Sequence, residues 1–449
     1  MTDAATLDVL ELNSRATLGA KAQLGETFDL GTTKELKRRR AREGRFRFYG
    51  LAAILISLAF LVLLIGSTLL KAAGALSQTE IALDITYEQS VVDPTGARDP
   101  EQLRLAATKP LITDALVAIF PEGSEREVRR ELSRLVSAGA SFELAERLAD
   151  NPNLVGTTEL VWLPANSNVD QFLKGKVDTD VEQTLRVLDD RELGWIATLE
   201  ERGQIERRFN RTFFSEGDSR EPELAGMLGA FIGSGLVVLT CFLFSFPVGV
   251  ATAVYLEEFA PKNRFTDFIE VNINNLAAVP SIVYGLLGLY MFLGVFGLPR
   301  SSPLVGGLVL ALMALPIIII ASRASLKSVP QSVRNAALGV GASRVQTTFH
   351  HTVPLAMPGM LTGTIIAMAR ALGETAPLLM IGMVAFIVDL PAGITDAATA
   401  LPVQIFLWFD SPERAFQERA SATIIVLLLF LVIMNLSAVL LRRKLERRW

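Results

Sequence analysis

The sequence predicts an all-α polytopic membrane protein with about six transmembrane helices. Half of its 449 residues are hydrophobic, and its apolar runs each exceed the roughly 18 residues that a helix needs to span hydrocarbon. These runs cover residues 49–70, 224–256, 268–297, 303–322, 358–388 and 420–441. Apolar residues are continuous along them rather than alternating, which excludes a transmembrane β-barrel.

A basic tail, residues 1–48, precedes the first helix. Its final stretch, KELKRRRAREGRFR, contains eight Lys or Arg against two Glu. Because Lys and Arg concentrate on the cytoplasmic side of membrane helices, we expect a cytoplasmic tail and a first transmembrane helix at residues 49–71. The following Ala73-Gly74-Ala75 resembles a signal-peptidase site, but the apolar run is too long for a signal peptide. We therefore expect an uncleaved anchor.

A large polar insert, residues 72–223, follows the first helix and contains no spanning run. It begins with a strand-like stretch, IALDITYE, and continues with amphipathic helical patterns such as EREVRRELSRLV and SFELAERLAD. A single crossing places it outside the cytoplasm, where long translocated domains are insensitive to the charge rule. Its Glu- and Arg-rich faces predict solvated surface, and docking of a partner protein is an open alternative.

The remaining five predicted helices form a core at residues 224–449. Alternation places residues 257–267, residues 323–357 and the basic C-terminal tail on the cytoplasmic side, where positive charge is expected. Both termini are therefore predicted to be cytoplasmic. The linker at 389–419 is then outside, and its apolar piece TALPVQIFLW is too short to span and is expected in the interface or as a re-entrant segment.

The composition excludes several kinds of site. Cys241 is the one cysteine, and the two histidines, His350 and His351, are adjacent, so no disulfide, thiolate cage or zinc site is predicted. We find no constellation of Ser/His, paired Asp or HExxH residues, and a nucleic-acid-binding arm is not expected beside a membrane anchor. The chain has no GxxxxGK(S/T) phosphate loop, so ATP would have to bind another chain.

Two charged residues interrupt the fifth apolar run. Arg370 lies eleven residues after Gly359, which is about 16 Å along a helix and about half the depth of a bilayer. A charge at that depth costs at least ~2.5 kcal/mol and by default marks a functional site. Glu374 is expected one helical turn further on the same face. Pro377 removes a helix hydrogen bond near the pair and predicts a bend.

A polar segment rich in small residues, 328–354, separates two apolar runs. Ser328 can cap a short helix that starts near Pro330, and Gly339 and Gly341 can end it as left-handed caps. Ser343 can then cap a second short helix, 344–352. The segment is expected to form a compact shape that fits a groove on a partner, with an ordinary connecting loop as the alternative.

The order of residues in this segment resembles the EAA loop of ABC-importer permeases. The resemblance rests on Asn335-Ala336-Ala337, then Gly341, then Val353-Pro354. It implies that an ATPase subunit contacts a set of residues here, namely Asn335, Ala336, Ala337, Gly339, Gly341, Ala342, Ser343 and Pro354. Asn335 replaces the family's Glu, which removes a charge, and His351 stands where Ile is usual, where we expect a core or interface role.

Three further stretches resemble the A-type permease of the bacterial phosphate importer, the Pst system: NNLAAVPSIVYGLLGL (274–289), ARALGETAPLL (369–379) and ALPVQIFLW (400–408). The resemblance covers about residues 225–445 and implies a type I ABC-importer permease fold in the bacterial inner membrane, without the insert. The implied partners are a second, C-type permease, a dimer of ATPase subunits holding ATP and Mg, and a periplasmic phosphate-binding protein. No cofactor is implied on this chain.

The charged pair suits phosphate as a substrate. Arg370 offers a planar fork of donors and keeps its charge, so it can clamp an oxyanion. Glu374 can accept the proton that phosphate carries near neutral pH, and it would repel sulfate, which has none. The alternative is a structural pair in which the two charges neutralise each other. Other candidates for the substrate pathway are Thr375, Arg323, Asn275, Ser281 and Tyr284; Arg323 can instead be a positive-inside anchor, and the last three can be interhelical hydrogen bonders.

Two other functions remain open at this point. One is a permease for another oxyanion within the same importer class. The other is an ion-coupled secondary transporter, which usually shows internal repeats or more than one intramembrane carboxylate. The sequence shows neither of these features clearly.

Overall fold

The computed structural model describes residues 34–177, 186–384 and 386–445 of the chain. The chain divides into two compact units, residues 1–67 and 68–449, which are described separately. The first unit contains most of helix α2, Lys34–Ala75. Its apolar side chains, such as Phe60 and Leu63, are exposed, as expected of a helix in lipid. Of the expected tail, residues 1–33 lie outside the described part.

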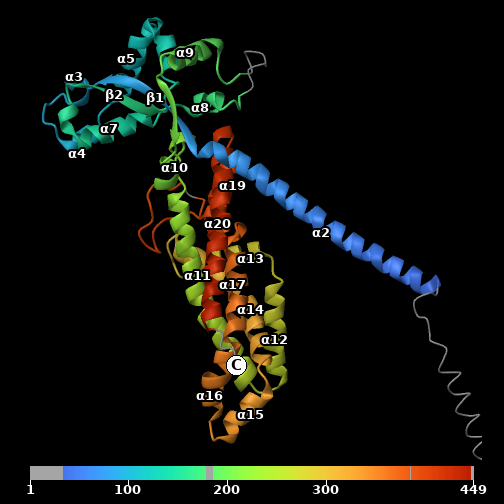
Figure 1. Ribbon diagram of the computed structural model, residues 1–449. Coiled ribbons are helices and arrows are strands. Elements are labelled where there is room, and N and C mark those ends of the chain that lie inside the picture. Colours follow the sequence, from blue (N-terminus) through green and yellow to red (C-terminus); the bar gives the residue numbers. More distant parts are fainter. Residues whose placement is uncertain (1–33, 178–185, 385, 446–449) are drawn as a thin grey trace, which may run out of the picture. The chain divides into compact units, whose positions relative to one another are not determined.

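The insert is a small α+β domain at the start of the second unit (Figure 1). Its sheet has the order β2-β1-β3, and β1 is antiparallel to both neighbours. The strands are β1 Ser77–Thr86, β2 Thr158–Pro164 and β3 Ile205–Phe209. The strand expected at IALDITYE therefore exists and begins earlier, whereas the patterning did not predict β2 and β3.

Helices cover one face of this sheet. Alternate β1 residues Ile81, Leu83 and Ile85 are fully buried, because successive strand side chains point to opposite faces. They pack against apolar residues of α5, α7 and α9. The helices of the insert are α3 Gln89–Val92, α4 Pro100–Arg104, α5 Lys109–Ile119, α6 Arg126–Leu132, α7 Ala140–Asp150, α8 Ser167–Leu173, α9 Asp190–Glu201 and α10 Thr212–Ser215, with short 3-10 turns η1 Pro121–Ser124, η2 Pro152–Leu154 and η4 Pro222–Leu224.

Helices joined by turns and irregular loops make up the described residues of the membrane part. Four of its helices, together with α2, are long and apolar enough to span a bilayer, and the total in the described part of the chain becomes six if one bent pair is counted as a span. The elements are α11 Leu228–Val254, α12 Arg264–Ala277, α13 Ser281–Gly288, α14 Pro303–Lys327, α15 Gln331–Gly339, α16 Arg344–Thr347, α17 Val353–Leu372, α18 Ala376–Met380, α19 Leu401–Asp410 and α20 Arg414–Leu445. Three π-helical turns join them, η5 Tyr255–Phe259, η6 Leu289–Val295 and η7 Thr348–Thr352. The predicted polytopic fold is confirmed.

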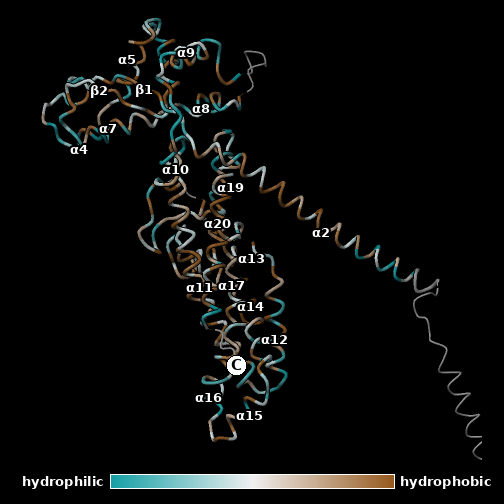
Figure 2. Tube along the Cα trace, viewed as in Figure 1, coloured by the Kyte–Doolittle hydropathy of each residue, from teal (hydrophilic) through white to brown (hydrophobic). Residues whose placement is uncertain are grey.

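Helix α14 packs between α11 and α17 at the centre of this part. Small residues allow the close approach: a Cβ on Gly307 of α14 would lie 2.4 Å from Thr240 of α11, and one on Gly363 of α17 would lie 2.2 Å from Ala321 of α14. Figure 2 shows the apolar character along these helices and α20. Interhelical packing of this kind, through small residues, is usual in membranes.

Two of the expected spans are interrupted rather than continuous. The run at 268–297 consists of α12 and α13 with η6, which meet at a bend of 102°. The run at 358–388 breaks after Leu372, and the short helix α18 begins at Ala376. A continuous stretch of apolar residues indicates that the chain is buried in lipid or protein, but it does not indicate where the chain bends. Hydropathy alone could therefore not reveal these breaks.

The short apolar helix α19 does not span. It packs on α20, and its residues Leu401 and Val403 are fully buried. The expectation that this piece is too short to cross therefore agrees with the structure.

The packing of α14 leads to a stability prediction. Gly307→Leu should destabilise the membrane part by about 1–3 kcal/mol, because overpacking displaces neighbours. Gly235→Leu on α11 is the matched control, since nothing lies within 4 Å of a Cβ there. Melting temperatures of the two detergent-solubilised variants test this. Equal melting temperatures would contradict the described packing of α11 against α14.

Candidate functional site

The pair Arg370 and Glu374 lies at the interruption between α17 and α18. The Nε atom of Arg370 is 3.5 Å from Oε1 of Glu374. Helix α17 ends before Glu374, and the backbone N–H groups of Gly373 and Glu374 donate to the carbonyls of Arg370 and Ala371. The two side chains therefore meet, but Glu374 belongs to the turn after the helix and not to one continuous helical face as expected.

The helix pairing places Arg370 near the middle of the membrane part. A Cβ on Gly359 would touch Ser325 and one on Gly363 would touch Ala321, so α17 and α14 run antiparallel with a constant register. Extending that register brings Arg370 level with about Ala314, close to the middle of α14. The charge therefore lies roughly 15–20 Å from either end of α14 at 1.5 Å per residue.

The environment of Arg370 leaves most of its guanidinium free. Its side chain is 50% exposed, and that of Glu374 is 20% exposed. Among the described residues, the contact with Glu374 is the one hydrogen bond of this guanidinium. Thr375 follows directly and precedes α18 without a side-chain capping bond. The other Arg370 donors can therefore bind an anion without first breaking a bond within the chain.

The second interruption holds three other candidates. Asn275 is exposed in the last turn of α12, and Ser281 is the first residue of α13. The hydroxyl of Tyr284 donates to the carbonyl of Leu276 across the bend, at 2.8 Å. Tyr284 thus holds the two half-helices together, which matches its interpretation as a structural hydrogen bonder.

The two interrupted spans contact each other. A Cβ on Gly285 of α13 would lie 2.8 Å from the Cα of Pro377 in α18, so these half-helices cross at very close range. This contact brings the segment with Ser281 and the segment with Glu374 into one region of the fold. Half-helices whose N-termini lie within the membrane are typical of sites for anionic substrates.

Arg323 lies elsewhere, in a cluster of compensating charges. Its Nη2 atom is 2.5 Å from Oε1 of Glu270, and its Nε atom is 3.6 Å from Oε2 of Glu257. Lys327 also faces Glu257, at 3.6 Å. Arg323 therefore lies between two carboxylates, with a side chain that is 13% exposed. The geometry favours its interpretation as an anchor.

The 328–354 segment has the capping geometry of two short helices. Gly341 has a φ of +91°, its N–H donates to Leu338 and the N–H of Ala342 donates to Ala337; this is a Schellman cap. Ser343 forms a capping box with Gln346 at the start of α16. Gly341 and Ser343 therefore cap as predicted.

Three details of this segment differ from expectation. Gly339 is the last residue of α15, with no left-handed φ, because one glycine is enough for the cap. Ser328 ends α14 and its hydroxyl donates to Ser325, so it does not cap the next helix. The stretch from Thr348 to Thr352 is a π-helical turn that leads into α17.

Most of the expected contact residues face outward. Asn335 and Ala336 are exposed, and so are Gly339, Gly341, Ser343 and Pro354, whereas Ala337 is buried and Ala342 half-buried. His351 is exposed as well, so it is not a core residue in this chain. Four large apolar side chains are also exposed beside them: Leu338, Val340, Val345 and Phe349. An exposed apolar patch of this kind indicates an interaction surface.

Sequence reasoning missed the residue that fixes this segment to the bundle. Arg334 of α15 donates to Glu258 at 2.8 Å and to the carbonyls of Val329 and Leu326 at 2.7 and 2.8 Å. Glu258 and its neighbour Glu257 lie in the π-helical turn η5. The signal was a pair of acids directly after an apolar run, but nothing in the sequence connects them with an arginine far along the chain.

No metal site is found in the part of the chain that the structure describes, because no three His, Cys, Asp or Glu residues gather there. The candidate site comprises the guanidinium and carboxylate at the interruption and the outward-facing 328–354 segment.

Comparison with known proteins connects the two parts of the chain to different families. Residues 245–449 match the family described as "Binding-protein-dependent transport system inner membrane component". Residues 33–183 match a domain of unknown function, DUF3333. One solved structure that matches, from the MetNI methionine ABC transporter, has 16% identity and a TM-score of 0.41, covering 49% of this chain and 98% of that one.

Curated relatives match the membrane part. Probable ABC transporter permease protein YqgI of Bacillus subtilis is 36% identical over 34% of this chain and 52% of its own length. Phosphate transport system permease protein PstA 1 of Mycobacterium tuberculosis is 30% identical over 50% of this chain and 72% of its length. PstA of Yersinia pestis is 33% identical over 47% and 71%. The chain therefore belongs to the PstA family of membrane permeases.

Proposed function

We propose that this chain is the transmembrane permease subunit of an ATP-driven phosphate importer. The relatives named for phosphate transport support the substrate, and the free guanidinium of Arg370 at mid-depth is the observation in the structure that carries the proposal. On this proposal the chain forms the translocation path with a second permease subunit, and it is not itself an enzyme.

The arrangement of the charged pair supports phosphate over an anion without a proton. Arg370 supplies positive charge and several N–H donors, and only one of them is engaged by Glu374. An ionised Glu374 can accept the proton of hydrogen phosphate, and the same charge repels sulfate. Phosphate can also displace the Arg370–Glu374 contact, because a contact of 3.5 Å with a half-exposed guanidinium is weak.

The outward-facing 328–354 segment supports an ATPase partner. We propose that the exposed apolar side chains around Gly341 dock in a groove on an ATPase subunit that binds ATP and Mg. Asn335 is exposed at this surface and would contact the ATPase as an amide rather than a carboxylate. A periplasmic phosphate-binding protein would deliver the solute from the opposite side of a bacterial inner membrane.

The first prediction concerns orientation in the membrane. With a cytoplasmic N-terminus, Ser90→Cys in the insert should react with a membrane-impermeant maleimide in intact spheroplasts. Ser343→Cys should react only after the membrane is permeabilised. Native Cys241 is buried and provides no background. Reaction of both variants from the same side would contradict the proposed topology.

The second prediction concerns coupling to ATP. Gly341→Val should abolish ATP-driven phosphate uptake while membrane abundance stays normal, because a β-branched residue is strained at a φ of +91°. Gly194→Val is the matched control: Gly194 lies in α9 of the insert and has open space around a Cβ. Uptake of radiolabelled phosphate, corrected for abundance, is the measurement. Normal uptake by Gly341→Val would show that this cap does not position the coupling surface.

The third prediction concerns the anion. Arg370→Lys should reduce uptake sharply because the planar fork is lost, and Arg370→Gln should reduce it further. If Arg370 binds phosphate, the double variant Arg370→Gln/Glu374→Gln should stay inactive at normal abundance. Recovery of uptake in the double variant would instead show a structural pair. Competition by sulfate against Glu374→Gln measures the contribution of the carboxylate to discrimination.

A further inference from the structure

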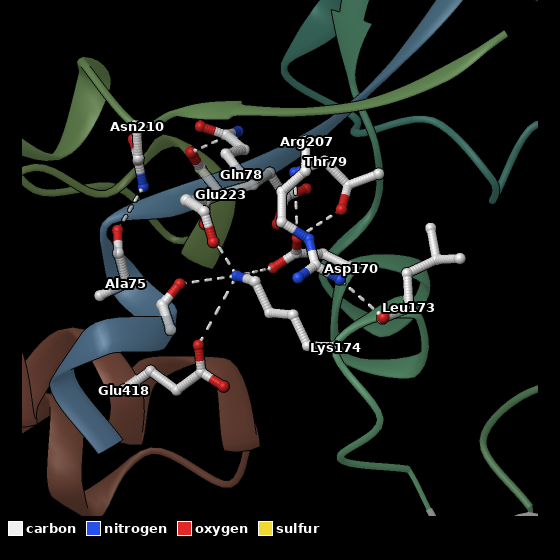
Figure 3. Close-up of polar contacts among 12 residues, drawn as sticks. Ala75, Gln78, Thr79, Asp170, Leu173, Lys174, Arg207, Asn210, Glu223 and Glu418 are labelled. Carbon is white, nitrogen blue, oxygen red and sulfur yellow. Dashed lines mark hydrogen bonds and ion pairs between the residues drawn. The ribbon is translucent and has the colours of Figure 1, made fainter. Parts of the chain in front are cut away.

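A buried polar junction joins the insert to the membrane helices. We define this junction by Asp170 and Lys174 at α8, Glu418 at the start of α20, and the carbonyls of Gly74 and Ser77 (Figure 3). These residues come from the insert, from the last helix and from the end of the first helix. The junction uses none of the residues assigned above to the substrate or to the ATPase.

The ammonium group of Lys174 connects all these elements. Its Nζ atom is 2.8 Å from the carbonyl oxygens of Gly74 and Ser77 and 2.5 Å from Oδ2 of Asp170. It is also 3.7 Å from Oε2 of Glu418. An ammonium has three donors, and the Lys174 side chain is 6% exposed. A cation this buried is held in place by its partners, because moving away from them would leave it unpaired.

The partners of Lys174 are themselves fixed. The other oxygen of Asp170 accepts from both the backbone N–H and the hydroxyl of Thr79, at 3.0 and 2.7 Å, which attaches α8 to β1. Glu418 also accepts from Lys176 at 2.5 Å. A Cβ on Gly74 would lie 2.4 Å from Oε2 of Glu418 and 2.5 Å from Nζ of Lys176, so a larger residue there would displace the ends of these two side chains.

Further contacts bind the same elements around the junction. Asn210, where the insert returns to the membrane, donates to the carbonyl of Ala75, and its N–H donates to Leu76. Arg419, next to Glu418, donates to the carbonyl of Ala225 at 2.5 Å. Both chain connections of the insert are therefore held beside the start of α20.

Glu223 lies close by, and its backbone carbonyl accepts from Gln78 at 3.1 Å. Burial raises the pKa of its carboxyl. The ion pairs of Lys174 are with Asp170 and Glu418. Glu418 is the one of these two carboxylates that belongs to the membrane part.

We propose that Lys174 and Glu418 are positioning residues that make the insert and the outer end of α20 move as one body during transport. Helix α20 packs against α17, the helix that carries Arg370, so the position of the insert is linked to the helix at the substrate site. The uptake measurement below rests on the proposed function. The rigid connection itself does not, because it concerns only the geometry of the chain.

The experiment measures the connection directly. Spin labels at Ser90→Cys in the insert and Gln417→Cys on α20, both exposed positions, report the distance between the two elements by pulsed electron resonance. With Lys174 present we expect one narrow distance distribution, unchanged between the resting complex and the complex trapped with ATP. Lys174→Met should broaden it, and Lys174→Arg should broaden it less because the charge is kept.

Lys109→Met is the matched control. Lys109 is exposed at the start of α5 in the insert and lies outside the junction, so its loss should leave the distribution narrow. Phosphate uptake per assembled complex should fall severalfold in Lys174→Met and stay near normal in Lys109→Met. A merely structural lysine would lower abundance and melting temperature without changing the uptake of the molecules that remain.

The two readouts separate the possible failures. A narrow distribution in Lys174→Met, or unchanged uptake per complex together with normal coupling, would overturn the proposed role. A distribution that broadens as expected, in a complex whose unmutated form takes up no phosphate, would support the rigid connection and count against the proposed substrate.

Discussion

The backbone of a membrane-spanning chain must satisfy its hydrogen bonds without help from water, and this constraint governs where the helices of this protein can stop. The chain breaks twice within its spans. At the first break, the Tyr284 hydroxyl takes up the carbonyl of Leu276. At the second, the N–H groups of Gly373 and Glu374 turn back onto the preceding residues. Pro280 and Pro377 have no N–H to satisfy. Each break therefore contains hydrogen-bond partners for its own backbone groups. Gly285 also allows the two broken segments to pack closely on each other.

Two arginines of the membrane part, Arg323 and Arg370, differ in how much fixed negative charge surrounds them. Arg323 faces two carboxylates and is 13% exposed, whereas Arg370 faces one carboxylate, 3.5 Å away, and is 50% exposed. A buried cation that lacks partners is costly, so an exposed one at mid-depth indicates an aqueous path or a partner chain beside it. The difference between them is therefore the number of fixed carboxylates and not their position in the sequence.

Local chemistry explains which features the sequence could predict. The spans follow from length and composition, the cap at Gly341 follows from the backbone freedom of glycine, and the capping box at Ser343 follows from a residue spacing of three. The 102° bend and the contact of Arg334 with Glu258 depend on residues distant in sequence, which no local pattern reports. The nearness of Arg370 and Glu374 was predictable from their spacing, but the end of α17 between them was not.

Two kinds of contact, apolar packing and buried polar bonds, join the insert to the membrane helices. Phe213, Trp408 and Phe416 form an apolar cluster at the same end of the bundle, and such packing stabilises without specifying direction. The bonds of Lys174 do specify direction, because each acceptor lies at a fixed position on a different element. Buried ion pairs contribute little net stability compared with apolar packing, and their attested use is to fix one arrangement among several. Gly74, which belongs to the stretch that resembles a cleavage signal in the sequence, packs against the carboxylate of Glu418. Its carbonyl accepts from Lys174, so the end of the first helix is part of the junction.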